Sequence, residues 1–344
     1  MPQGGGWCLG EHQASCYQIL ALDGGGARAV FTAAFLAALE ETSGIRLADC
    51  FDLVAGTSAG GLIALALGAG YKPSEILAFF KDRAPEIFPL TSGLARALRI
   101  PRWIARSKYE SETLKGCLQE YFGDRRLGQS ALRLVIPAFD SARGGVYLFK
   151  TPHHRDLRTD FQVPMWEVAY ATAAAPTYFP AYVSSSSVRL VDGGIWANNP
   201  AMVALAEGLG YLGWPQTSIS LLSIAPPHSP IGNSARSVAG GLFAWRDVVK
   251  LLMVGQSCAA SNECLHILGE GRFYRVDVAI PAEPPLDQIS DDLEGIGTTE
   301  ARNLINRIDQ RFLRHKAGPY KPWYQVNGNS PAEAKKGSEN EREG

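Results

Sequence analysis

Short apolar runs alternate with longer segments of helical spacing along most of the chain. The short runs, which predict strands, cover residues 17–22, 51–55, 132–139, 146–149, 188–191 and 218–224. The segments that predict helices cover residues 30–41, 59–69, 164–175 and 200–212, the last with a proline in its first turn. Because strands that alternate with helices build parallel sheets covered on both faces, this order predicts an α/β fold with a mainly parallel sheet.

Two segments of different composition flank this region. Residues 1–16 are rich in glycine, and residues 327–344 are polar or charged with almost no apolar side chains. No Pro-, Gly- or Ser-rich linker divides residues 17–324. We therefore expect an N-terminal extension over 1–16, one domain with a variable C-terminal part over 17–324, and a disordered tail over 325–344.

The composition is typical of a globular protein. The 344 residues are 46% hydrophobic and 19% charged, with a formal net charge of -1, which argues against a nucleic-acid polymer as partner. Six cysteines are scattered without a CxxC pair, as expected for reduced thiols. Residues 1–16 lack a signal-peptide pattern, and the longest apolar stretch, 62–70, is too short to span a bilayer. These features predict a cytoplasmic location.

The strongest local motif is the G-x-S-x-G of Gly56-Thr57-Ser58-Ala59-Gly60, which stands between a predicted strand and a predicted helix. Such a tight turn presents the serine hydroxyl at the carboxyl edge of a sheet, and its glycines remove steric clashes. The helix N-terminus behind the serine favours developing negative charge. Ser58 is therefore the candidate nucleophile, although a serine in a glycine-rich turn can also be a simple helix cap.

A glycine run follows the first predicted strand. It begins at Asp23, continues through Gly24, Gly25 and Gly26, and is followed by Arg28. Consecutive glycines allow backbone N–H groups to converge into an anion-binding nest, which an acyl hydrolase needs for the oxyanion of its tetrahedral intermediate. Arg28 either adds positive charge there or holds the shape of the loop.

The same loop also fits the loose dinucleotide-binding form G-x-G-x-x-G/A through Gly24, Gly26 and Ala29. That motif requires an acidic residue at the end of the next strand, where it holds a ribose. The nearest acids, Asp49 and Asp52, lie at the beginning of the 51–55 strand instead. The sequence therefore disfavours dinucleotide binding.

A third motif, Asp192-Gly193-Gly194, directly follows the predicted strand 188–191. Catalytic groups of α/β folds lie at the carboxyl ends of strands, and the two glycines leave the aspartate accessible. Asp192 is therefore the candidate base, although Asp-Gly turns are common. An exposed aspartate is a weak base at neutral pH, so this role requires burial to raise its pKa.

In this order, the three motifs resemble those of the patatin-like phospholipase family: a D-G-G-G-x-R/K loop, a G-x-S-x-G turn and a D-G-G/A motif. Residues 171–181 and Asn198-Asn199-Pro200 also resemble family segments. The resemblance is close over 17–210 and loose over 211–320. Within the family, the chain is similar to the bacterial phospholipase effectors of cyclic-nucleotide-activated antiphage systems.

The resemblance implies a three-layer α/β/α sandwich and a phospholipase A that works through a Ser58–Asp192 dyad and an acyl-enzyme. The oxyanion would be held by the glycine loop, with no metal or other cofactor required for catalysis. It further implies a cyclic dinucleotide activator, action on membrane phospholipids from the cytoplasmic side of the inner membrane, and ligand-driven homo-oligomers. A non-catalytic patatin-like module that only binds nucleotides is the alternative from another class.

A Ser-Asp-His esterase of the α/β-hydrolase type is a further alternative. Ser58, Asp192 and His228 stand in the chain order of that triad, and His228 follows the predicted strand 218–224. A single histidine after a strand is more often structural, and the glycine loop favours the dyad.

The remaining histidines and cysteines give no metal motif. His153 and His154 stand in a polar stretch, so we expect them at the surface. Cys258, Cys264 and His266 are close in sequence but lack zinc-ligand spacing, and we expect thiols packed in a helix.

Two charged segments have no assigned chemistry. Residues 92–108 contain five cationic residues and no acid, mixed with aliphatic residues and Trp103. This pattern suits an anionic membrane surface, but it also fits a lid over the site, a phosphate-binding patch or a solvated face. Residues 283–294 are acidic and contain proline, so we expect a surface loop.

Overall fold

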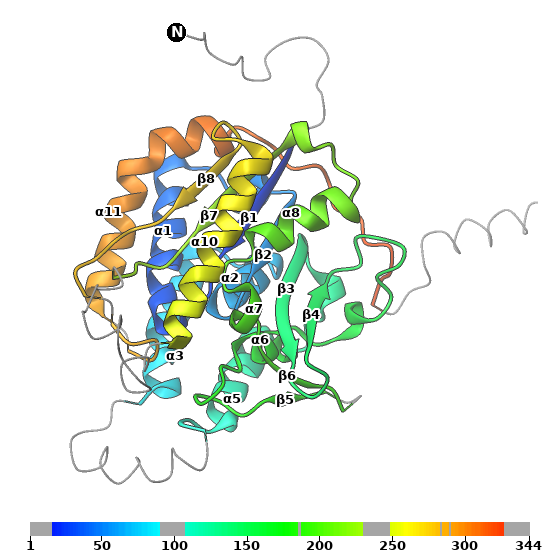
Figure 1. Ribbon diagram of the computed structural model, residues 1–344, viewed down its shortest axis with the longest axis vertical. Coiled ribbons are helices and arrows are strands. Elements are labelled where there is room, and N and C mark those ends of the chain that lie inside the picture. Colours follow the sequence, from blue (N-terminus) through cyan, green and yellow to red (C-terminus); the bar gives the residue numbers. More distant parts are fainter. Residues whose placement is uncertain are drawn as a thin grey trace, which may run out of the picture.

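The computed structural model describes residues 16–89, 107–184, 187–229, 248–282, 284–288 and 290–326. The expected N-terminal extension and tail lie almost wholly outside these residues, as does most of the basic segment 92–108. The described residues form an eight-stranded sheet with helices on both faces (Figure 1). The strands are β1 (Tyr17–Leu22), β2 (Leu53–Gly56), β3 (Arg133–Asp140), β4 (Gly145–Lys150), β5 (Tyr182–Val183), β6 (Arg189–Asp192), β7 (Ile219–Ile224) and β8 (Phe273–Val276). The principal helices are α1 (Ala29–Ser43), α2 (Ala59–Gly68), α3 (Pro73–Ile87), α5 (Ser111–Phe122), α6 (Met165–Ala173), α7 (Gly194–Ala197), α8 (Ala201–Gly210), α10 (Val248–Leu268) and α11 (Asp291–Ile308).

Alternate residues of the central strands supply two separate hydrophobic cores. On β1, Leu20 and Leu22 belong to the core on one face, and Ile19 and Ala21 belong to the core on the other. Helices α1, α2, α3, α6 and α11 build the first layer, and α8 and α10 build the second. A strand buried on both faces reads as a continuous apolar run, which is why these strands were visible in the sequence. The predicted three-layer α/β/α sandwich is confirmed.

The sheet is parallel in its central part and antiparallel at one side. Its strand order is β5-β6-β3-β2-β1-β7-β8, with β4 also paired to β3. Strands β1, β2, β3, β7 and β8 are mutually parallel, and β4, β5 and β6 run antiparallel to their neighbours.

Strand β3 holds two neighbours along a single edge. Strand β2 pairs with residues 133–135, β6 pairs in the opposite direction with residues 138–140, and β4 occupies the other edge over 135–140. Strands β2 and β6 therefore run toward each other, and their carboxyl ends meet beside Ile136 and Pro137. This convergence places Ser58 next to Asp192.

Some sequence-based expectations for the fold were wrong. Residues 283–294 are not simply a surface loop, because Asp287 is buried and α11 begins at Asp291. Pro200 precedes α8 as its cap residue instead of standing in its first turn. Within the described part of the chain, no helix is long and apolar enough to cross a membrane.

Candidate active site

Ser58 occupies a strained turn between β2 and α2. Its backbone has φ 55° and ψ -126°, a positive φ that is uncommon for a residue with a side chain. The flanking glycines explain how the turn closes. A Cβ on Gly56 would lie 2.2 Å from the Gly60 carbonyl oxygen, and a Cβ on Gly60 would lie 2.4 Å from the Leu22 carbonyl oxygen. Positions 56 and 60 of the G-x-S-x-G motif must therefore be glycine, because the start of α2 lies too close to the ends of β1 and β2 to leave room for a side chain.

Asp192 ends β6 and is buried. Its carboxylate accepts a hydrogen bond from the Gly194 N–H at 2.7 Å and lies close to the Ser58 hydroxyl. Burial raises the pKa of Asp192 to about 6, although the interactions with Ser58 and Gly194 oppose the rise. Burial therefore makes the Asp192 carboxylate a stronger base than an exposed aspartate. A Cβ on Gly193 would lie 2.4 Å from the Pro137 carbonyl oxygen, so the turn after Asp192 packs directly on β3.

Thr172 of α6 joins the two halves of the site, and no specific sequence pattern indicates this role. The Ser58 N–H donates to its hydroxyl oxygen at 2.9 Å, and the same hydroxyl donates to the Pro137 carbonyl oxygen at 2.6 Å. Thr172 is buried completely. It fixes the backbone of the serine turn against β3, close to the end of β6.

The glycine loop lies beside Ser58, because a Cβ on Gly24 would be 3.2 Å from the Ser58 Cβ. The Gly24 N–H already donates to the Asn198 carbonyl oxygen at 2.9 Å. Among the backbone hydrogen bonds of the described residues, none uses the N–H groups of Gly25 and Gly26. These two groups, at the N-terminal side of α1, remain as the candidate oxyanion donors.

The side chain of Arg28 supports the loop. Its Nε donates to the Gly25 carbonyl oxygen at 3.4 Å, and its backbone N–H donates to the same oxygen at 3.1 Å. The backbone N–H of Ala27, the residue before Arg28, donates to the Leu286 carbonyl oxygen at 2.7 Å. The loop is thus held from the 284–288 segment as well as from within.

Asp23, the first residue of the loop motif, forms a buried ion pair with Arg275 of β8. The guanidinium donates to both carboxylate oxygens, at 3.1 and 2.7 Å, and to the Ser223 hydroxyl at 2.6 Å. Burial raises the pKa of Asp23, and the charge and hydrogen bonds of Arg275 oppose that rise. The sequence did not reveal Arg275, because its strand lies far along the chain in the loosely similar region.

Helix α10 holds the segment that follows Asp192. The Asn198 N–H donates to Gln256 Oε1 at 2.8 Å, and Asn199 Nδ2 donates to the Ser261 hydroxyl at 2.9 Å. Since the Asn198 carbonyl oxygen accepts from the glycine loop, α10 indirectly braces that loop. Asn198 and Asn199 therefore connect the segment after Asp192 with α10 and with the glycine loop.

The structure does not assemble the alternative triad. His228 is half-exposed, and its Nδ1 lies 3.0 Å from Asp277 Oδ1. The Asp192 carboxylate instead interacts with Ser58 and with the Gly194 N–H. His228 is therefore placed to pair with a different carboxylate.

The expectation that His153 is a surface residue was wrong. It is buried, with Nδ1 2.9 Å from the Thr151 hydroxyl and Nε2 2.9 Å from Glu207 Oε1. The Lys150 ammonium binds the other oxygen of Glu207 at 2.5 Å. Burial lowers the pKa of His153, although Glu207 opposes this.

Among the described residues no group of side chains could hold a metal ion, and Cys264 is buried in α10 whereas Cys258 is exposed.

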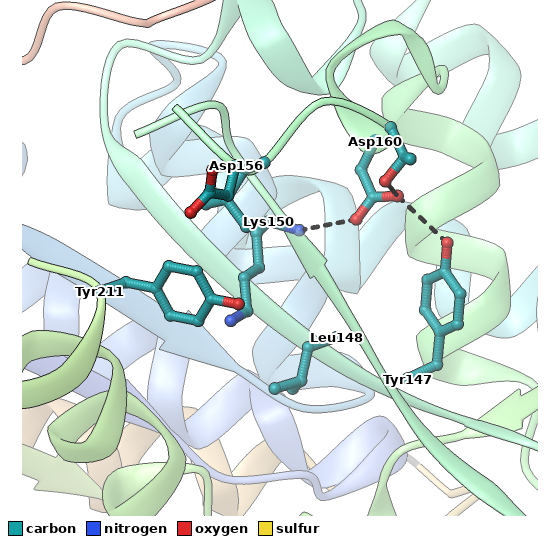
Figure 2. A pocket seen from close by; sticks show the side chains of 8 residues that line it. Tyr147, Leu148, Lys150, Asp156, Asp160 and Tyr211 are labelled. Atoms are coloured by element: carbon teal, nitrogen blue, oxygen red, sulfur yellow. Dashed lines mark hydrogen bonds between the residues drawn. The ribbon is translucent and has the colours of Figure 1, made fainter. Parts of the chain in front are cut away.

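Two cavities lie apart from the Ser58 side chain. One, of about 260 Å³, is lined by Lys150, Asp160 and Tyr211 among others, and none of its lining residues belongs to the three motifs (Figure 2). The other, of about 350 Å³, is a mainly apolar groove between α7, α8 and α10 that includes Trp196 and Met202.

Comparison with known proteins identifies the class. The family model described as patatin-like phospholipase matches residues 20–205. A cGAMP-activated phospholipase of Pseudomonas aeruginosa (strain BWHPSA011 / Pa011) is 33% identical, over 92% of this chain and 98% of that protein. One of the same name from Vibrio cholerae serotype O1 is 30% identical, over 89% and 94%. Patatin-like protein 1 of Arabidopsis thaliana is 33% identical, over 56% of this chain and 51% of the plant protein.

The fold and these matches define a hydrolase of lipid esters. The chain belongs to the patatin-like phospholipase family.

Proposed function

We propose that this enzyme is a phospholipase A that releases fatty acids from membrane phospholipids, with Ser58 as nucleophile and Asp192 as general base. The observation that carries the proposal is the position of the Ser58 hydroxyl beside a buried carboxylate whose pKa is raised to about 6. A base with that pKa is ionised at neutral pH, yet accepts a proton more readily than an exposed aspartate does. The N–H groups of Gly25 and Gly26, which make no backbone hydrogen bond to another described residue, lie in the loop next to Ser58.

The reaction follows from these positions. Ser58 Oγ attacks the ester carbonyl carbon while Asp192 accepts the hydroxyl proton, and the carbonyl electron pair moves to its oxygen. The N–H groups of Gly25 and Gly26 stabilise this oxyanion. Collapse of the intermediate expels the lysophospholipid oxygen, which takes the proton from Asp192. A water molecule, deprotonated by Asp192, then attacks the acyl-enzyme carbonyl carbon. Collapse of this second intermediate breaks the bond to Ser58 Oγ, which takes its proton back from Asp192, and the fatty acid is released.

Control by a cyclic dinucleotide, with action at the cytoplasmic face of the inner membrane, is part of the same proposal. Its support is that the two relatives named cGAMP-activated phospholipase match about nine-tenths of this chain, well beyond the 20–205 region of the family model. Nucleotide-driven assembly into homo-oligomers would be one way to transmit the signal.

The test is fatty-acid release from phosphatidylethanolamine and phosphatidylglycerol vesicles, with and without cGAMP and other cyclic dinucleotides. We expect release by the wild type only with a nucleotide, a loss of about 10⁴-fold or more in Ser58→Ala and Asp192→Ala, and activity in His228→Ala. Light scattering in the same samples reports any change in oligomeric state. A folded but inactive His228→Ala would support the triad, and release independent of every nucleotide would remove the activation proposal.

A further inference from the structure

The large apolar side chains that the described residues expose gather at one end of the molecule. Five of them lie at the end of the sheet where β3 terminates, and two, Tyr211 and Trp323, lie elsewhere. The five are between 40% and 67% exposed and comprise Val146, Val183, Ile195, Leu251 and Leu252.

Val146 and Val183 are fixed by strand pairing. Val146 lies opposite Phe139 near the carboxyl end of β3, and Val183 lies opposite Arg189, where β6 begins. Because β6 runs antiparallel to β3, its first residue lies beyond the end of β3. The arrowhead of β3 and strand β5 accordingly lie toward the lower end of Figure 1.

The other three flank the turn after Asp192. Ile195 follows Gly194, whose N–H donates to the Asp192 carboxylate. Leu251 and Leu252 stand near the start of α10, which packs on α7. The adjacent Met253 brings its Cε to 3.7 Å from the position of a Cβ on Gly194. These apolar side chains therefore border the candidate catalytic residues.

Trp323 and Tyr211 mark the opposite end of the sheet. The Trp323 N–H donates to Pro152, just after Thr151, whose N–H bonds Leu134 at the beginning of β3. Tyr211 follows the last turn of α8, near Trp214, which stacks on Tyr17 at the start of β1. Scattered apolar residues are ordinary on protein surfaces, whereas five of these seven described residues lie at the same end of the sheet.

We propose that Val146, Val183, Ile195, Leu251 and Leu252 form a docking surface for an anionic phospholipid bilayer. The inference rests on the proposed function, because a lipid ester must pass from the bilayer to Ser58, and Ile195, Leu251 and Leu252 flank the turn that follows the neighbouring Asp192. Such side chains insert at the boundary between headgroups and acyl chains. Arg189, opposite Val183, is exposed at the same end and favours anionic headgroups. Arg143, in the turn before β4, is also exposed there, although its guanidinium pairs with Asp140 at 3.4 Å.

The test separates binding from hydrolysis. Binding is measured in the Ser58→Ala background by co-sedimentation with vesicles of phosphatidylglycerol and phosphatidylethanolamine, with and without cGAMP. We expect Leu252→Glu and Val183→Glu each to lower the partition coefficient about tenfold, since a charge replaces an inserted apolar group. Trp323→Glu, a matched change at the other end, should alter it less than about twofold.

Hydrolysis of a soluble short-chain ester by the same three variants with Ser58 intact should stay near the wild-type rate. Absence of ester hydrolysis in the wild type would count against the proposed function and leave the binding result valid. The docking surface is overturned if the parent does not bind vesicles in either nucleotide condition, or if the Glu variants bind as the parent does. It is also overturned if Leu252→Glu dissociates a dimer detected by light scattering, because the surface would then be a contact between copies.

Discussion

The Ser58 hydroxyl lies close to the Asp192 carboxylate because β2 and β6 approach each other along one edge of β3. Neither residue reaches the other through a flexible loop. Ser58 directly precedes α2, and Asp192 is the last residue of its strand. The ends of β2 and β6, together with Thr172, hold Ser58 and Asp192 in their relative positions before substrate binds. Such prior positioning favours catalysis by a base that needs no rearrangement.

The pKa of Asp192 predicts the acid limb of the pH profile. Because the base acts in its ionised form and its pKa is about 6, kcat/KM should fall about tenfold per pH unit below that value. The measurement is kcat/KM for a soluble ester between about pH 4.5 and 8. A rate that is flat down to about pH 4 would mean that Asp192 titrates as an ordinary aspartate, contrary to its burial.

The same shift predicts a stability cost above pH 6. A carboxyl group whose pKa is raised on folding, here from 3.8 to about 6, ionises first in the unfolded state, so the free energy of unfolding falls as pH rises between these two values and stays lower above them. Asp192→Asn should therefore be more stable than the wild type near pH 8, by up to about 3 kcal/mol. The difference should shrink near pH 5, as urea unfolding at both pH values would show. An equal difference at both pH values would contradict this origin.

The sequence predicted the site wherever local geometry dictates the residue. Gly56, Gly60 and Gly193 are glycines because backbone lies within 2.4 Å of any Cβ there, so the pattern is visible in a few consecutive residues. The strands were visible because both of their faces are buried.

The parts that were missed depend on contacts between distant segments. The pairing of Arg275 with Asp23 and the burial of His153 against Glu207 leave no local pattern. Helix α10 was expected only around Cys258 and Cys264, and its extent was missed because its apolar and polar residues are mixed around the helix and give no one-sided stripe. Helix α3 was missed for a different reason, since it contains Pro85, which usually ends a helix.

Gly26→Ala should abolish activity because the substitution combines strain with a clash. Gly26 has φ +56°, and an added Cβ would lie 2.2 Å from the Leu286 carbonyl oxygen. Gly44 is a matched control, with φ +67° and nothing within 4 Å of its Cβ position. We expect Gly44→Ala to cost about 1 kcal/mol in stability and to keep its kcat. Similar kcat values for the two variants would show that the loop tolerates displacement.

Arg275 should position the glycine loop through Asp23. Arg275→Lys retains the charge but cannot donate two parallel hydrogen bonds, so we expect kcat to fall about tenfold with KM unchanged.

Arg275→Met leaves a buried carboxylate uncompensated and should lower the free energy of unfolding by about 3–5 kcal/mol, measured by urea unfolding. Arg314→Met, which breaks an exposed pair with Asp309, should cost at most about 1 kcal/mol. Equal costs for the two Met variants would argue against a special role for Arg275.

The Lys108–Asp287 pair should act on the glycine loop through the backbone of Leu286. Asp287 is buried and bonded to the Lys108 ammonium and, at 2.7 Å, to the Tyr109 hydroxyl, which fixes the segment whose Leu286 carbonyl oxygen accepts the Ala27 N–H. Asp287→Ala frees that segment, and a misplaced oxyanion loop should lower kcat by about 10–100-fold at constant KM.

A double-mutant cycle with Lys108→Met and Asp287→Asn separates this positioning effect from general destabilisation. The two changes remove the same ion pair, so their effects on log kcat should be clearly less than additive. Tyr109→Phe, which removes only one hydrogen bond to Asp287, should have a smaller effect. Additive losses in kcat would show that the pair only stabilises the fold. The same conclusion would follow if the unfolding midpoints fall while kcat, normalised to the active enzyme counted from the acyl-enzyme burst, stays normal. Because Lys108 ends the basic segment 92–108, a coupled result would also connect that segment to the oxyanion loop.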